Sequence, residues 1–93
     1  MTKFKVEVSE TVCRMLGKLD EKTASRMKIA LSELANDPFT SRAKADIKKL
    51  HGFEKNPLYR MRIGDYRAVY FVIDSIVKVT DVILRNKGYD WIE

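Results

Sequence analysis

The fold is decided by the stretch Leu58-Tyr59-Arg60-Met61-Arg62-Ile63-Gly64-Asp65-Tyr66-Arg67-Ala68-Val69-Tyr70. Apolar and polar residues alternate on both sides of Gly64-Asp65, a dipeptide that tolerates positive φ and is typical of a two-residue hairpin loop. With that loop, Arg62 lies directly opposite Arg67. Two residues before Arg62 on the first strand, Arg60 lies opposite Val69. The stretch therefore predicts an antiparallel β-hairpin with a defined register.

The predicted hairpin has one basic face and one apolar face. Side chains alternate between the two faces of a strand, so Arg60, Arg62 and Arg67 project together. The other face receives apolar and aromatic residues, namely Tyr59, Met61, Ile63, Tyr66, Ala68 and Tyr70. Like charges placed opposite one another destabilise a sheet. Three arginines in this arrangement therefore indicate that an anion lies between them.

Length and composition limit the possible classes of protein. The chain has 93 residues, of which 45% are hydrophobic and 33% charged, so we expect one compact domain spanning residues 1–93. A single cysteine excludes an internal disulfide, and a single histidine leaves no metal-ligand cluster, so no cofactor is expected. There is neither a signal peptide nor an apolar run of about 20 residues. We expect a cytoplasmic protein without a membrane segment.

The positive charge is concentrated in the middle of the chain. Residues 42–67 contain eight basic and three acidic residues, so this segment accounts for the whole net charge of +5. Localised positive charge raises the rate of encounter with polyanions such as nucleic acids.

The order of elements predicts an α+β fold. A strand is expected over residues 4–8, followed by a helix capped by Ser9 and a longer helix capped by Asp20 that ends at Asn36-Asp37-Pro38. Residues 47–50, the hairpin and residues 76–84 supply the remaining strands. The resulting order is β-α-α-β-β-β with a short C-terminal helix or tail. A small, mainly antiparallel sheet should pack against a helical hairpin.

The arginine cluster limits the chemistry. Guanidinium groups bind phosphate through charge-assisted, often bidentate hydrogen bonds, and Tyr89 offers a ring on which a base can stack. These features suit RNA or DNA binding, or RNA cleavage in which arginines stabilise charge on the phosphate. The lone His51 precedes a glycine, which favours a surface turn over a general base. Cys13 is expected to be a packed small hydrophobic residue.

The hairpin sequence resembles that of the RelE/ParE superfamily of bacterial and archaeal toxins. The shared pattern is Leu-Tyr-Arg-x-Arg-x-Gly-Asp-Tyr-Arg-x-x-Tyr at residues 58–70. It is preceded by Lys49-Leu50-His51-Gly52, which is similar to the family's Lys-Leu-x-Gly turn. The ending Arg85, Lys87 and Tyr89 also fits the family's Arg-x-Lys-x-Tyr pattern. The resemblance spans almost the whole chain and implies a RelE-like fold.

The resemblance implies a toxin of a type II toxin–antitoxin pair. The RelE branch is a metal-independent endoribonuclease that cleaves mRNA in the ribosomal A site and so inhibits translation. By this resemblance, Arg60 and Arg62 lie near the scissile phosphate, and Arg67 stabilises the transition state. Arg85 protonates the leaving 5′-oxygen or holds the phosphate. Tyr89 stacks on a base or assists the attacking 2′-hydroxyl.

Additional basic residues are expected to bind the RNA, namely Lys48, Lys49, Lys55 and Lys87. One departure from the family affects the mechanism, because some RelE enzymes have lysines where this chain has Arg60 and Arg62. Arginine is a poor general base, since its pKa exceeds 12. The remaining candidates for that role are Tyr89, Lys87 and His51.

The sequence leaves two alternative functions open. A ParE-like toxin shares the fold but poisons DNA gyrase and cuts no RNA. A non-enzymatic RNA-binding domain would use the same basic face without catalysis. The family also implies a cognate antitoxin that forms a heteromeric complex with the toxin. An acidic or amphipathic segment of that antitoxin would mask the arginines or displace the C-terminal tail.

Overall fold

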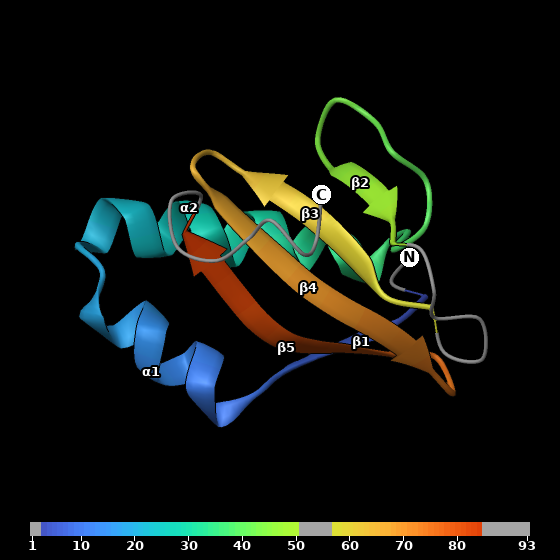
Figure 1. Cartoon of the computed structure of the whole chain (residues 1–93), viewed down its shortest axis with the longest axis horizontal. Coiled ribbons are helices and arrows are strands. Elements are labelled where there is room, and N and C mark those ends of the chain that lie inside the picture. Colours follow the sequence, from blue (N-terminus) through green and yellow to red (C-terminus); the bar gives the residue numbers. More distant parts are fainter. Residues whose placement is uncertain (1–2, 51–56, 85–93) are drawn as a thin grey trace.

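One five-stranded sheet, with helices on one of its faces, forms the body of the molecule (Figure 1). The computed structural model describes residues 3–50 and 57–84. Across the sheet the strand order is β1-β5-β4-β3-β2. The strands are β1 (Lys5–Val8), β2 (Asp46–Lys49), β3 (Tyr59–Ile63), β4 (Tyr66–Ile73) and β5 (Ile76–Leu84). Only the pairing of β1 with β5 is parallel among these strands. The predicted α+β class with a mainly antiparallel sheet is therefore confirmed.

Each helix begins at the predicted cap. Helix α1 (Glu10–Lys18) follows Ser9, whose hydroxyl accepts a hydrogen bond from the backbone N–H of Val12. Helix α2 (Glu21–Ser32) follows Asp20, whose carboxylate accepts one from the N–H of Thr23. The interaction with Thr23 holds the pKa of the Asp20 carboxyl below its usual value. A short 3-10 turn, η1 (Glu33–Ala35), then ends the helical segment just before Asn36-Asp37-Pro38, as predicted.

The hairpin of β3 and β4 has the predicted register. Arg62 pairs with Arg67, and Arg60 pairs with Val69. Gly64 has a φ of 59° in the loop, a conformation that is far less costly for glycine than for other residues. The following loop, between β4 and β5, also has two residues, Asp74 and Ser75, and both have positive φ. These two turns therefore set the pairing of the three central strands.

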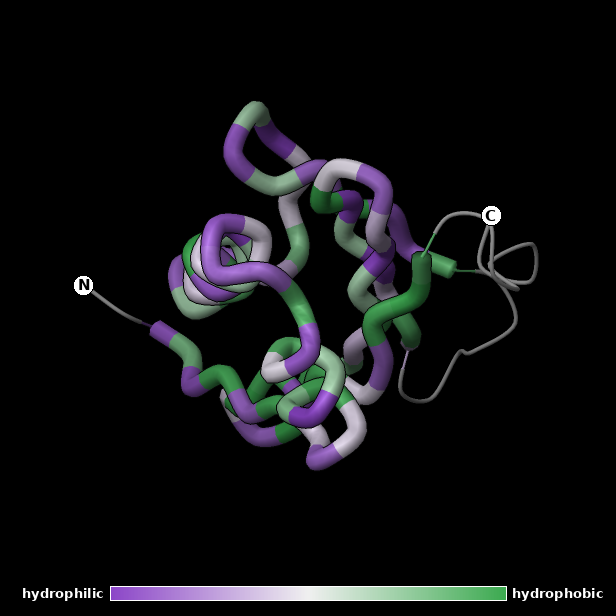
Figure 2. The backbone as a smooth tube through the Cα atoms, turned by 90° about the vertical axis from the view of Figure 1, so that its left-hand side faces the viewer, coloured by the Kyte–Doolittle hydropathy of each residue, from purple (hydrophilic) through white to green (hydrophobic). Residues whose placement is uncertain are grey.

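The hydrophobic core lies between the helices and the predicted apolar face of the hairpin. Figure 2 shows the helices on one side of this layer and the sheet on the other. The helices contribute buried residues such as Leu16 and Met27, and the sheet contributes the buried side chains Met61, Ile63, Ala68, Tyr70, Val77 and Val79. The alternation of the hairpin sequence thus selects which side of the sheet receives the helices.

Tyr70 links the centre of the sheet to a distant loop. Its side chain is 0% exposed, and its hydroxyl donates a 2.7 Å hydrogen bond to the carbonyl oxygen of Pro38. Its ring stacks on that of Tyr59, with a centroid separation of 5.6 Å. Tyr59 in turn contacts Phe39, and Phe39 contacts Phe4, both edge to face. The row of rings connects the hairpin with the loop after the helices and the start of the chain.

Cys13 is exposed, so the prediction of a packed small hydrophobic residue was wrong. It follows Val12 in α1, and the buried positions of that helix are Val12 and Leu16, which turns Cys13 away from the core. Within residues 3–50 and 57–84, no helix is long and apolar enough to cross a membrane.

We expect Tyr70→Phe to lower the free energy of unfolding by about 1–2 kcal/mol, because the buried carbonyl of Pro38 would lose its donor. Urea denaturation at pH 7 measures this change. Tyr66→Phe is the control, since Tyr66 is only partly buried in the same strand. Equal stability of Tyr70→Phe and the wild type would contradict the expected contribution of this hydrogen bond.

Tyr70 should also make stability depend on alkaline pH. Burial raises the pKa of its phenol well above the usual value, whereas in the unfolded chain the pKa is about 10. Above about pH 10 the unfolded chain loses this proton and the folded protein keeps it, so the free energy of unfolding falls by up to about 1.4 kcal/mol per pH unit. Tyr70→Phe lacks this effect. The stability advantage of the wild type over Tyr70→Phe should therefore shrink between pH 9 and pH 11 in urea titrations, and a constant difference would refute the assignment.

Candidate functional site

The three hairpin arginines lie on the face of the sheet that points away from the helices. Their placement follows from the register, in which Arg62 pairs with Arg67 and Arg60 lies two residues from Arg62. Their exposure differs. Arg62 is exposed, whereas Arg60 is 7% and Arg67 is 3% exposed. The face therefore presents one accessible guanidinium beside two that are buried.

Arg67 is held by the loop of its own hairpin. Its Nη1 donates to the carbonyl oxygens of Gly64 at 3.2 Å and Tyr66 at 3.0 Å. Gly64 lies in the predicted loop and Tyr66 is the first residue of β4, so the hairpin itself fixes the direction of this side chain. Hydrogen bonds of this kind orient a buried cation.

Asp46 lies between Arg60 and Arg62, although no pattern in the sequence pointed to it. The pairing of β2 with β3 sets Asp46 directly opposite Arg62. Its Oδ1 accepts a hydrogen bond from Arg60 Nη1 at 3.3 Å, and its Oδ2 lies 3.8 Å from Arg62 Nε. The backbone oxygen of Asp46 accepts a second bond from Arg60 Nη1 at 3.2 Å. A carboxylate of the protein itself is thus an anion between these two arginines.

The predicted RNA-binding lysines divide between the two faces. Lys48 pairs with Arg60 and shares the arginine face, whereas Lys49 pairs with Tyr59 and points to the opposite face. Both are exposed. The other predicted site residues lie outside the described residues, namely Arg85, Tyr89, Lys55, Lys87 and His51. Their roles stay predictions from the resemblance.

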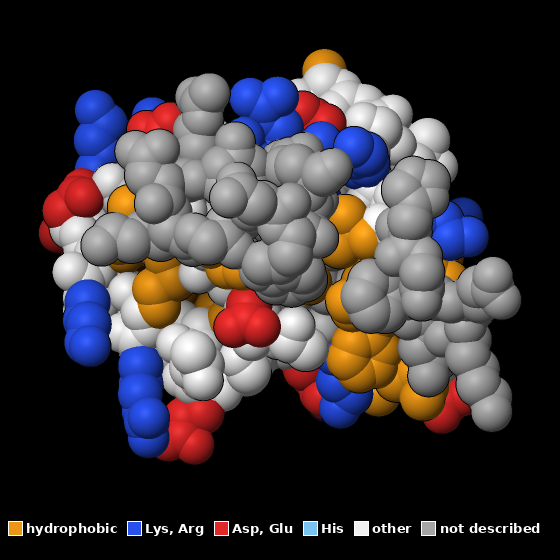
Figure 3. Space-filling view, in the orientation of Figure 1, with side chains coloured by type: hydrophobic (Ala, Val, Ile, Leu, Met, Phe, Trp, Pro, Cys, Tyr) orange, Lys and Arg blue, Asp and Glu red, His pale blue; other side chains and the backbone are white. Residues whose placement is uncertain are grey.

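Apolar side chains also lie on the arginine face. Leu50 and Val69 are buried in a small cluster, against which Leu58 and Ile83 pack. Figure 3 shows the molecule from this side, with patches of hydrophobic side chains and separate lysine and arginine side chains visible toward the edges of the view. These buried apolar side chains give the neighbouring guanidinium groups a low-dielectric surrounding, which strengthens their interaction with an anion. The combination suits the binding of a phosphate group.

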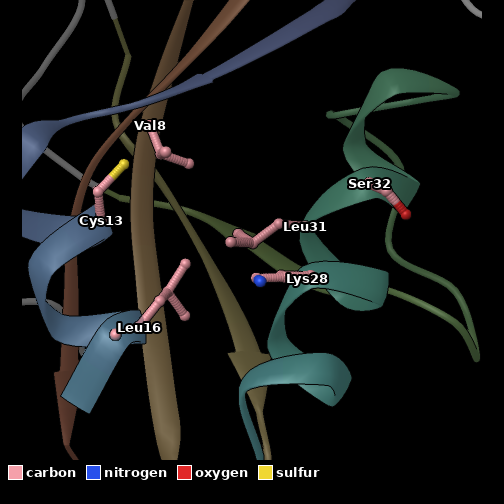
Figure 4. A pocket seen from close by; sticks show the side chains of 7 residues that line it. Val8, Cys13, Leu16, Lys28, Leu31 and Ser32 are labelled. Atoms are coloured by element: carbon pink, nitrogen blue, oxygen red, sulfur yellow. The ribbon is translucent and has the colours of Figure 1, made fainter. Parts of the chain in front are cut away.

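A groove of about 470 Å³ lies elsewhere, between α1, α2 and the end of β1 (Figure 4). Its lining includes Val8, Leu16 and Leu31, with Cys13 and Lys28 among the polar or reactive groups. No group of three or more His, Cys, Asp or Glu side chains that could hold a metal occurs in the described part of the chain. The groove is mostly apolar and does not include the arginines.

Known proteins are similar to this chain in sequence and in fold. A family model described as the ParE toxin of the type II toxin–antitoxin system parDE matches residues 6–89. The putative toxin RelE1 of Methanocaldococcus jannaschii is 32% identical over 89 residues, which cover 94% of this chain and 96% of that protein.

Two solved complexes contain chains of the same fold. A chain of the archaeal RelE–RelB complex from Pyrococcus horikoshii OT3 superposes with a TM-score of 0.78 at 30% identity, covering 92% of this chain and 99% of that chain. A chain of the RelB–RelE antitoxin–toxin complex from Methanococcus jannaschii gives a TM-score of 0.69 at 27% identity, with coverages of 92% and 98%. The predicted resemblance is confirmed. This chain belongs to the RelE/ParE superfamily, the toxins of type II toxin–antitoxin systems.

Proposed function

We propose that the protein is a RelE-like, metal-independent endoribonuclease that cleaves mRNA in the ribosomal A site and thereby inhibits translation. The observation that supports this function best is the arginine face of a RelE/ParE toxin, where Arg62 pairs across the sheet with Arg67 and adjoins Arg60. Three guanidinium groups in one place suit the binding of an RNA phosphate. Action on translating ribosomes implies a cytoplasmic location.

Cleavage in this proposal is an in-line displacement at the phosphorus atom. The 2′-oxygen forms a bond to phosphorus and loses its proton, while the bond to the 5′-oxygen breaks and that oxygen gains a proton. The transition state carries additional negative charge on the phosphoryl oxygens. Arg67, oriented by the carbonyls of Gly64 and Tyr66, would stabilise that charge, and Arg62 would bind the same phosphate from the opposite strand.

Proton transfer requires groups other than these arginines. A guanidinium stays protonated at every physiological pH, so Arg60, Arg62 and Arg67 cannot remove the proton from the 2′-hydroxyl. In the proposal, Tyr89 assists that hydroxyl or stacks on a base. Arg85 protonates the leaving oxygen or holds the phosphate. The ribosome would contribute the remaining rate enhancement by holding the mRNA in line for attack.

The proposed partner besides the ribosome is a cognate antitoxin. Support comes from the two RelE–RelB complexes whose chains share this fold and from the positive charge of the arginine face. An acidic segment lying over that face would compete directly with RNA, because both would occupy the same guanidinium groups. The toxin would then be inactive in the heteromeric complex.

Replacing single arginines tests whether the arginine face is needed for cleavage. We expect Arg67→Ala and Arg62→Ala to lower the rate of A-site cleavage by about 100-fold or more, because each removes a charged donor from the transition state. Primer extension on mRNA in translating ribosomes measures the cleavage. Arg14→Ala is the matched control, since Arg14 is an exposed arginine of α1 that pairs with Glu10. This variant should cleave at the wild-type rate.

Each variant should first be checked by circular dichroism and thermal unfolding, because Arg67 is buried. A folded Arg67→Ala variant that binds RNA but does not cleave it would support a role in the transition state. A folded wild type, free of antitoxin, that produces no A-site cleavage would refute the nuclease proposal. RNA binding by that wild type would then favour the non-enzymatic RNA-binding alternative.

A ParE-like gyrase poison remains the second candidate function, because the matching family model is that of the ParE toxin. A supercoiling assay with purified DNA gyrase distinguishes the two. We expect the wild type to leave supercoiling unchanged at concentrations that stop translation. Inhibition of gyrase without cleavage of mRNA would favour the ParE-like function.

A further inference from the structure

The contacts of Asp46 carry an inference that rests on the proposed function. We infer that the Asp46 carboxylate is a built-in competitor of the RNA phosphate, so that RNA must displace it from Arg60 and Arg62 to bind. Its two oxygens face different arginines, with Oδ1 3.3 Å from Arg60 Nη1 and Oδ2 3.8 Å from Arg62 Nε. A phosphate that bridges the same two guanidinium groups would take the place of these oxygens.

The carboxylate can leave without disturbing the sheet. Asp46 begins β2, a four-residue strand at the edge of the sheet (Figure 1), and its side chain is 54% exposed. A rotation about its χ1 angle moves the carboxylate into solvent while the backbone stays paired with Arg62.

Arg60 remains hydrogen-bonded when the carboxylate leaves. The backbone oxygen of Asp46 accepts a bond from Arg60 Nη1 at 3.2 Å, and this bond does not depend on the carboxylate. This remaining hydrogen bond lowers the free-energy cost of removing the carboxylate from the buried Arg60 cation. Arg62 is more accessible, since its side chain is 50% exposed, so an entering phosphate would reach Arg62 first.

The competing charge lowers the affinity for RNA. While Asp46 is in place, Arg60 and Arg62 together with this carboxylate carry one net positive charge rather than two. RNA binding by an isolated toxin is weakened accordingly, and only RNA held close by another interaction displaces the carboxylate efficiently. The same penalty applies to free RNA and to mRNA on the ribosome, but additional contacts on the ribosome would keep mRNA bound there at concentrations at which free RNA stays largely unbound.

Asp46→Asn tests the inference, because asparagine keeps the shape and an acceptor oxygen but removes the charge. We expect about five- to tenfold tighter binding of inorganic phosphate and of a 2′-O-methyl RNA oligonucleotide that cannot be cleaved. Arginine Nε–H signals in NMR titrations report the phosphate, and fluorescence anisotropy reports the RNA. The slope of log K against log salt for the RNA should steepen by about 0.7.

Glu10→Gln is the matched control, since Glu10 pairs with Arg14 on α1 and its replacement changes the net charge by the same amount. It should leave both affinities unchanged. In the background of Arg62→Ala, the gain from Asp46→Asn should largely disappear, because one of the two released guanidinium groups is gone. A gain in folded Asp46→Asn that Glu10→Gln does not show therefore reports the competition itself.

Unchanged or weaker phosphate binding by folded Asp46→Asn would overturn the inference, as would an equal gain in Glu10→Gln. If Asp46→Asn proved unstable, Asp46→Ala would replace it with the same expected direction. The result is independent of the nuclease assay. Tighter phosphate binding together with a wild type that cleaves no mRNA would support the competition and refute the proposed function. Unchanged phosphate binding together with a wild type that cleaves mRNA would refute the competition and support the proposed function.

Discussion

The antiparallel register of β3 and β4 is the constraint on which the rest of the structure depends. The pairing of Arg62 with Arg67 assigns every side chain of the hairpin to one of two faces. A shift of one residue would send Met61 and Ala68 to the basic face and bury the arginines under the helices. The core and the basic face are therefore two results of one pairing, and neither can be changed without the other.

The arginine face combines charges that a sheet would ordinarily keep apart. Two features of the structure stabilise the arrangement. Carbonyl oxygens of the hairpin turn accept hydrogen bonds from Arg67, and Asp46 contributes a carboxylate near Arg60 and Arg62. The apolar cluster of Leu50 and Val69 lies on the same side of the sheet. Buried guanidinium groups with fixed partners keep a defined direction, which a site for a phosphate requires.

Local sequence patterns predicted most of the fold. Alternation and the Gly64-Asp65 loop were sufficient for the hairpin register, and the caps Ser9 and Asp20 were sufficient for the helix starts, because these signals involve residues close in sequence. The position of Asp46 could not be predicted in this way. It depends on how an edge strand pairs with β3 across a long connection, and nothing near Asp46 encodes that register.

The other differences between prediction and structure also arise from tertiary packing. Lys48 and Lys49 are adjacent in a strand and so point to opposite faces, but only the pairing of β2 with β3 shows that Lys48 is the one on the arginine face. The burial of Arg67 was not evident from a motif that only placed it on a strand. In each case the missing information was tertiary, since it depended on what packs beside the residue.

The parallel pairing of β1 with β5 has a consequence for the synthesis of the protein. Lys5 pairs with Ile76 and Val8 with Val79, and the hydroxyl of Ser9, the cap of α1, donates to the carbonyl oxygen of Thr80. The first strand and the cap of the first helix therefore acquire these contacts only when β5 has left the ribosome. The β3–β4 hairpin has local contacts and can form earlier. A nascent chain therefore cannot complete its sheet before β5 has emerged from the ribosome, so the complete toxin fold is acquired later than the hairpin that carries the arginines.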